Sequence, residues 1–311
     1  MRRRFAVAMV AAAVLCATEP RQVRAEQSAL QAVCANTSGT TAPDTQIDAC
    51  SKIIQAGSET QKNLANAYLS RGAGYGRKGD YDRAIADFTK AIELDPKLAR
   101  AYYDRGLVYD REGNYDRAVA DYGTAIEFDP KYVHAYNNRG LIYNRQGDYD
   151  RAIADYTKAI ELDPQHANAY SNRGNTYARR GDYDRAIVDY TKAIELDPKL
   201  AVAYANRCWV RAINGQLAPA MTDCDEALRL KPDDAVALDS RGFVYYMLAR
   251  YDEAVADYSS ALGVNPKSAS SLYGRGMSKL KKADPTGNAD IAAAKAIQPD
   301  IADEMVRYGL K

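Results

Sequence analysis

Residue types that could carry out chemistry are sparse in this 311-residue chain. Two histidines, His134 and His166, and five cysteines could act as nucleophiles or metal ligands. No His or Cys pair among them has the short spacing of a zinc site. The segment 74–79 (GYGRKG) matches G-x-G-x-x-G, which binds dinucleotide phosphates where it follows a strand and opens a helix. No strand pattern precedes it, so we predict no cofactor.

Motifs of hydrolytic catalysis are also missing from the sequence. Neither G-x-S-x-G nor H-E-x-x-H occurs, and each would be needed to place a nucleophile or a zinc-bound water. The many aspartates recur at regular intervals, which is typical of helix ends and not of paired catalytic carboxylates. We therefore predict that the protein is not an enzyme and holds no metal.

The first residues indicate export. Three arginines at 2–4 precede an apolar run at 5–17, which is too short to span a bilayer. Residues 23–25 (VRA) offer a small-residue cleavage site, so we predict a signal peptide at 1–25 that uses the general secretory route. A cytosolic chain with an apolar start is the alternative. We expect a periplasmic or secreted protein with no stable membrane insertion after cleavage.

Composition points to one local pattern copied many times. The chain has 24 Tyr but only 4 Phe and 1 Trp. The formal net charge of +1 gives no basic surface for nucleic acid, so we predict none as a partner. A 34-residue period is indeed visible, and its full units cover 65–98, 99–132, 133–166, 167–200, 201–234 and 235–268.

The residue pattern of each unit predicts two antiparallel helices. Position 15 is usually Gly, which can end the first helix in a left-handed conformation. Asp at positions 16 and 18 can cap the second helix, and Pro at position 32 stops it. Small residues at positions 8, 20 and 27 allow close helix approach, and aromatic residues at 11, 17 and 24 fill the gaps.

This pattern resembles the tetratricopeptide repeat (TPR), with its Gly at 8, Tyr at 11, Ala at 20 and 27, and Pro at 32. The resemblance implies an all-α fold, a right-handed α-solenoid of helix-turn-helix hairpins. Residues 65–268 would form its six TPR units, and residues 26–64 a degenerate N-terminal capping hairpin. Residues 269–311 would form a degenerate seventh unit and a C-terminal capping helix, because a solenoid must cover its last apolar face.

The chain departs from the usual TPR pattern at two positions. Position 7 is Arg in every unit, from Arg71 to Arg241, and position 23 is Asp, from Asp87 to Asp257. We expect an Arg–Asp ladder between helices. If these pairs are exposed, each adds at most ~1 kcal/mol.

Four cysteines remain after the predicted cleavage. Cys208 and Cys224 replace the Gly and the aromatic residue of positions 8 and 24 in one unit, where the two helices touch. This joint replacement predicts a Cys208–Cys224 disulfide, and the same 16-residue spacing predicts a Cys34–Cys50 disulfide. Buried free thiols are the alternative. Redox catalysis is disfavoured because no Cys-x-x-Cys occurs.

The resemblance also implies a concave groove lined by the first helices. We call the side chains at positions 2, 5, 6, 9, 12 and 13 of the units the groove face. Asn175 and Asn206 match a pair that holds a peptide carboxylate in some family members, but Ser171 and Ala205 stand where the usual Lys would be. A solvated helix face is the alternative. The polar candidates of the groove face are Arg77, Arg111, Arg145, Arg179, Asn138, Asn172, Asn175 and Asn206.

Aromatic candidates follow in the second half of the groove face, at Trp209, Phe243 and Tyr246. They form a binding hot spot if they are exposed, and a core if the capping helix buries them. The sequence favours a non-catalytic adaptor or scaffold that binds a protein or peptide. The acidic groups of that ligand would face the first half of the groove, and its apolar groups would face the second half. A self-associating structural protein and an accessory repeat domain of a transferase complex are the alternatives.

Overall fold

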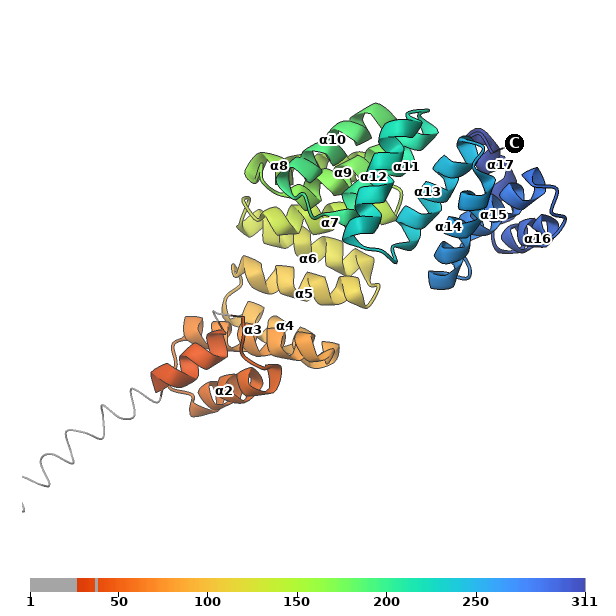
Figure 1. Cartoon of the computed structure of the whole chain (residues 1–311). Coiled ribbons are helices and arrows are strands. Elements are labelled where there is room, and N and C mark those ends of the chain that lie inside the picture. Colours follow the sequence, from red (N-terminus) through yellow and green to blue (C-terminus); the bar gives the residue numbers. More distant parts are fainter. Residues whose placement is uncertain (1–26, 37–38, 311) are drawn as a thin grey trace, which may run out of the picture. The chain divides into compact units, whose positions relative to one another are not determined.

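The computed structural model describes residues 27–36 and 39–310, and over that part the chain is helical with short connections (Figure 1). The predicted signal peptide lies outside the described residues. Within them, every helix is too short or too polar to cross a membrane. The described residues form two compact units, one that runs up to residue 142 and one that begins at residue 143.

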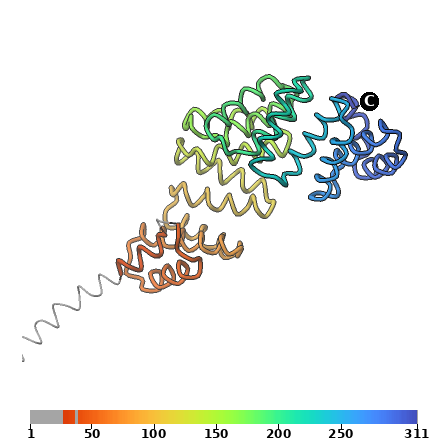
Figure 2. Tube along the Cα trace, viewed as in Figure 1, coloured from red at the N-terminus to blue at the C-terminus, as the bar shows by residue number. Residues whose placement is uncertain are grey.

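The first unit contains a helical segment at 27–35 and then antiparallel helices that pack on their neighbours in chain order. Its Cα trace reverses direction at each connection (Figure 2). The helices are α2 (Pro43–Ala56), α3 (Gln61–Lys78), α4 (Tyr81–Leu94), α5 (Ala99–Arg111), α6 (Tyr115–Phe128) and the start of α7 (Val133–Arg145).

The second unit continues the pattern and ends on a short helix that packs against α15 and α16. Its helices are α8 (Tyr149–Leu162), α9 (Ala167–Arg179), α10 (Tyr183–Leu196), α11 (Ala201–Ile213), α12 (Leu217–Leu230), α13 (Ala235–Met247), α14 (Tyr251–Val264), α15 (Ala269–Lys281), α16 (Gly287–Ile297) and α17 (Ile301–Arg307). The all-α solenoid of helical hairpins is confirmed.

The turns inside the hairpins follow the predicted chemistry. Gly at position 15 has a positive φ, for example 79° at Gly79 and 81° at Gly181, where a side chain would be strained. The same conformation recurs at Ala249 (φ 58°) and Ala283 (φ 61°), where no glycine is present. After the turn, the Asp80 carboxylate accepts a hydrogen bond from the backbone N–H at the start of α4.

Close packing explains the glycine at position 8. A Cβ at Gly106 would lie 2.9 Å from the Tyr122 ring. Where Cys208 replaces this glycine, the aromatic partner is replaced by Cys224, and the two sulfurs form a disulfide. A second disulfide joins Cys34 to Cys50. The predicted pairings are therefore the ones that the structure contains.

The Arg–Asp ladder is confirmed for several units, with bidentate geometry. In α5, the Arg105 Nε and Nη2 atoms donate to the Asp121 carboxylate at 2.8 and 2.9 Å. The Arg105 Nη1 atom donates to the Thr89 hydroxyl of the preceding 34-residue repeat at 3.0 Å. This Arg–Asp pair therefore also joins neighbouring repeats. The same pairing occurs in Arg71–Asp87, Arg173–Asp189, Arg207–Asp223 and Arg241–Asp257.

These pairs are more buried than the sequence suggested. The Asp223 side chain is only 3% exposed, and its partner Arg207 is 10% exposed. The limit of ~1 kcal/mol per pair holds for exposed pairs, so it does not apply to this one. Removing one partner of a buried pair leaves an uncompensated charge, which costs about 3–5 kcal/mol.

Candidate functional site

The arginines of position 13 contribute to the groove face less than expected, because two of them bind their own chain. The Arg77 guanidinium donates to the Thr41 carbonyl at 3.0 Å and to the Gln46 side-chain oxygen at 2.5 Å. The Arg179 guanidinium donates to the Asn144 carbonyl near the end of α7 at 3.1 Å. Such bonds satisfy carbonyl groups that lie near helix ends.

The other polar candidates differ in exposure. Arg111, Arg145 and Asn175 are exposed, whereas Asn172 and Asn206 are half-buried. The Asn138 side-chain amide donates to the Tyr103 hydroxyl at 3.1 Å and is thereby fixed.

A patch of tyrosine and aspartate lies on the first unit. The Tyr103 and Tyr132 rings pack with their centroids 4.8 Å apart. Burial raises the pKa of the neighbouring Asp104 to about 6. The Arg100 guanidinium lies 3.5 Å from the Asp104 carboxylate and partly compensates its charge.

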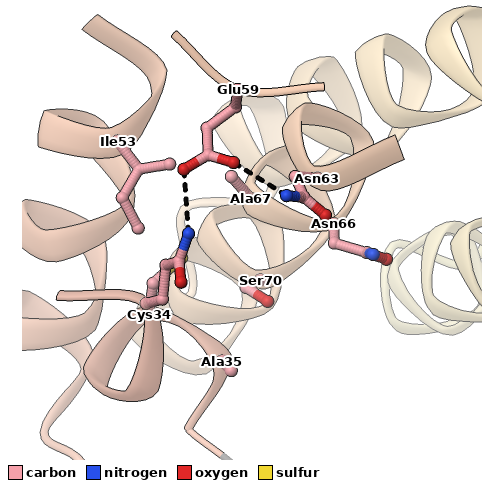
Figure 3. A pocket seen from close by; sticks show the side chains of 9 residues that line it. Cys34, Ala35, Ile53, Glu59, Asn63, Asn66, Ala67 and Ser70 are labelled. Carbon is pink, nitrogen blue, oxygen red and sulfur yellow. Dashed lines mark hydrogen bonds between the residues drawn. The ribbon is translucent and has the colours of Figure 1, made fainter. Parts of the chain in front are cut away.

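A small pocket of about 200 Å³ lies beside the first disulfide (Figure 3). Glu59 points into it and accepts hydrogen bonds from Gln27, Gln31 and Asn63 at 2.8–3.0 Å. These amide donors lower the pKa of the Glu59 carboxyl. The carboxylate stays ionised, but its oxygens are held by these amides and are less available to accept hydrogen bonds from a ligand.

The aromatic candidates of the second unit are mostly buried. Phe243 is fully buried and Tyr246 is 6% exposed, in one core cluster with Ile301 and Met305 of α17. Neither ring is available to a partner, because both pack in the core to which α17 contributes. Trp209 is half-buried, and its ring packs against Phe243 at 5.0 Å.

Sequence reasoning missed a pocket of about 320 Å³ between this tryptophan and α17. It contains Asp239, which stands at position 5 of its unit. Burial raises the pKa of the Asp239 carboxyl to about 6, although the Ser270 and Ser271 hydroxyls donate to it. The signal available in the sequence was an acidic residue at a groove-face position. The other wall, formed by α17, could not be deduced from spacing.

The described residues include no cluster of three acidic, His or Cys side chains that could hold a metal ion. What the groove face offers is hydrogen bonding, charge and aromatic surface. Such groups suit the recognition of an extended chain.

Family comparisons agree with the repeat pattern. A model of the TPR repeat matches residues 72–113, 111–147 and 140–181, and models of the tetratricopeptide repeat match residues 167–200 and 244–304. The chain therefore belongs to the tetratricopeptide-repeat proteins. No curated protein matches it.

Solved structures show the same fold at low identity. The chain is 20% identical to PilF of Pseudomonas aeruginosa, with a TM-score of 0.61, and the match covers 68% of this chain and 97% of that one. The Cut9–Hcn1 assembly of the APC/C matches at 18% identity and a TM-score of 0.66, over 86% of this chain and 52% of that one. YrrB, described as a TPR protein with an unusual peptide-binding site, matches at 25% identity and a TM-score of 0.52, over 63% of this chain and 98% of that one.

Proposed function

We propose that the protein is a non-catalytic adaptor or scaffold that binds a peptide or protein segment along its groove face. One observation carries the proposal. The residues at the repeated positions stabilise the fold, whereas the residue types on the groove face vary from one repeat to the next. The ladder arginines are held between helices. Arg111 and Asn175 are exposed on first helices. The similarity to YrrB, a TPR protein with an unusual peptide-binding site, supports the same role.

We propose a smaller set of binding residues on the groove face. Asn175 and Asn206 remain candidates for holding a peptide carboxylate or backbone, and Arg111 and Arg145 for attracting acidic groups. Trp209 is the accessible aromatic candidate. Arg77, Arg179 and Asn138 are engaged within the chain, so we assign them a supporting role.

We also propose that the protein works outside the cytoplasm, in the periplasm or as a secreted protein. The support is the two disulfides, which persist in oxidising compartments. Purified exported protein should show no reactive thiol in denaturant without reductant, and its N-terminal residue should be Glu26. Four reactive thiols or an uncleaved start would contradict the proposal.

Peptide selection tests the binding function. The full chain with both disulfides is panned against displayed random peptides, and enriched peptides are then titrated by fluorescence anisotropy. We expect Asn175→Ala combined with Asn206→Ala to weaken binding about tenfold, since two hydrogen bonds to the ligand are lost.

The matched control is Lys192→Ala combined with Glu195→Ala, which removes an exposed ion pair on the second helix α10. This control should bind as the wild type does. The proposal fails if no peptide is enriched, or if every enriched peptide binds the asparagine variant and the control equally well.

A further inference from the structure

The pocket of about 320 Å³ in the second unit has walls from several helices that are distant in sequence. Trp209 comes from α11, Asp239 from α13, Ser270 from α15 and Glu304 from α17, and Tyr308 directly follows α17. Ligand pockets for small molecules span about 300–1,000 Å³. This one is at the lower limit, which suits a single long side chain.

The charge of the pocket is entirely negative. Its lining includes the carboxylates of Asp239 and Glu304 and no Lys or Arg. Among the described residues, neither carboxylate forms an ion pair. Asp239 accepts hydrogen bonds from the Ser270 and Ser271 hydroxyls, and Glu304 accepts one from the Gln298 amide at 2.6 Å.

This arrangement contrasts with the ladder carboxylates of the same unit. Asp223 is held by two guanidinium groups, those of Arg207 and Arg211, and Asp257 is held by Arg241. Buried carboxylates are normally paired with a cation. Among the described residues Asp239 is half-buried and has no such partner, and burial accordingly raises its pKa. A cation entering the pocket would therefore gain more from Asp239 than from a carboxylate that is already paired.

The remaining walls are suited to the rest of a basic side chain. The Trp209 and Tyr308 rings meet edge to face with their centroids 5.2 Å apart. Aromatic faces attract ammonium and guanidinium groups, and this chain uses such contacts elsewhere, as between Arg207 and the Tyr204 ring at 5.8 Å. Met305 and Val236 add apolar surface that can cover an alkyl stem.

We propose that this pocket binds the cationic end of a Lys or Arg side chain that belongs to a peptide on the groove face. The inference rests on the proposed peptide-binding function and adds a specificity element to it. A basic anchor residue would enter the pocket between α13 and α17, with its charge against Asp239 and its stem against the aromatic rings.

Trp209 makes the test direct, because it is the only tryptophan of the chain and it lines the pocket. Acetyl-Gly-Lys-Gly-amide and acetyl-Gly-Arg-Gly-amide are titrated into the oxidised full chain while Trp fluorescence is recorded. Peptides with norleucine or Glu in the central position serve as comparison probes. We expect a saturable fluorescence change with the basic peptides, and affinity at least tenfold lower for norleucine and Glu.

Asp239→Asn preserves the shape of the side chain and removes the charge, and we expect it to lower affinity for the basic peptides at least tenfold. Glu304→Gln should lower it less, because Glu304 is a second carboxylate at the same pocket. The matched control is Glu195→Gln, an exposed carboxylate on the second helix α10 that already has Lys192 beside it. It should change affinity less than twofold. Circular dichroism establishes that each variant is folded.

The proposal is overturned if norleucine peptides bind as tightly as basic ones, or if folded Asp239→Asn binds like the wild type. A failure of this kind is separable from failure of the proposed function. In that case, peptides enriched by panning would still require Asn175 and Asn206 but would show no preference for Lys or Arg.

Discussion

The groove faces of the two units surround their half-buried carboxylates with different groups. In the first unit, Asp104 has the Arg100 guanidinium at 3.5 Å. In the second unit, the partners of Asp239 among the described residues are serine hydroxyls, and α17 adds Glu304 to the same pocket. Burial raises the pKa of Asp104 and of Asp239 to about 6. The difference is the neighbouring cation. Arg100 lies beside Asp104, whereas no Lys or Arg lines the pocket that contains Asp239.

This difference teaches how one repeat serves two purposes. The position-7 and position-23 pair is completed in the same way in both units, as Arg105–Asp121 and Arg207–Asp223 show. Groove-face positions are not constrained in this way, so they can carry charge that the fold does not neutralise. A protein that binds a ligand needs such unsatisfied groups, and a frame of satisfied pairs can hold them in place.

The largest expected effect compares one rung of the ladder in each unit. Asp223→Ala leaves Arg207 and Arg211 without their shared carboxylate, and we expect it to lower the free energy of unfolding by about 3–5 kcal/mol. Asp87→Ala strands only Arg71, whose side chain is 20% exposed, and should cost about 1–3 kcal/mol. Urea unfolding followed by circular dichroism measures both. Equal losses of unfolding free energy would show that leaving Arg211 without its carboxylate adds no further cost.

The next effect tests whether α17 covers the groove face of the second unit. Met305→Ala removes a side chain that is 2% exposed and packs in the cluster with Phe243 and Tyr246. We expect a loss of about 2–4 kcal/mol and a red shift of Trp209 fluorescence as the wall of its pocket loosens. The neighbouring Val306 is 45% exposed, so Val306→Ala should change stability by less than about 0.5 kcal/mol. Similar losses in both variants would contradict the packing of α17.

Much of the fold could be predicted from the sequence because its causes are local and repeated. Gly at position 15 in five of the six copies, Asp after it in three and Pro at position 32 in all six set the helix bounds. The 16-residue spacing of Arg207 and Asp223 placed both on facing helices, and the same spacing placed Cys208 opposite Cys224. Periodicity therefore predicted contacts within a hairpin.

The candidate site could not be predicted to the same extent, because its contacts involve non-repeating parts. Whether Phe243 is exposed depends on α17, which has no counterpart in the regular units. The bonds of Arg77 to Thr41 and Gln46 depend on the irregular N-terminal hairpin. Asp239 became a candidate only when α15 and α17 enclosed it.

A smaller effect concerns the unpaired carboxylate and pH. Since burial raises the pKa of Asp239 to about 6, its proton binds more tightly in the folded chain than in the unfolded one. This contribution to stability is complete below about pH 4 and is lost as pH rises through about 6. Wild type should therefore lose about 1–3 kcal/mol relative to Asp239→Asn between pH 4 and pH 7.

Thermal and urea unfolding of both proteins at each pH give this difference directly. The ionisable groups near Asp239 are Glu304 of α17, Tyr308 directly after α17, and Tyr258 of α14. Tyrosines do not titrate in this range, and burial and nearby Asp239 raise the Tyr258 pKa further. Repeating the comparison in a Glu304→Gln background isolates Asp239. A difference that does not vary with pH would show that Asp239 is well solvated.

The smallest effect compares the hairpin turns of the two units. In the first unit these turns use Gly79 and Gly113, whereas the last two of the second unit place Ala249 and Ala283 at φ of 58° and 61°. A Cβ in this region costs about 1–2 kcal/mol in backbone energy, part of which is offset because glycine has more freedom in the unfolded chain. We expect Ala249→Gly to stabilise the protein by about 0.5–1 kcal/mol in urea unfolding. The reverse change, Gly113→Ala, has no neighbouring atom within 4 Å of its new Cβ, so it should destabilise by a similar amount through backbone strain alone. The prediction fails if Ala249→Gly destabilises the protein. That result would show that Ala249 adopts the left-handed conformation without strain.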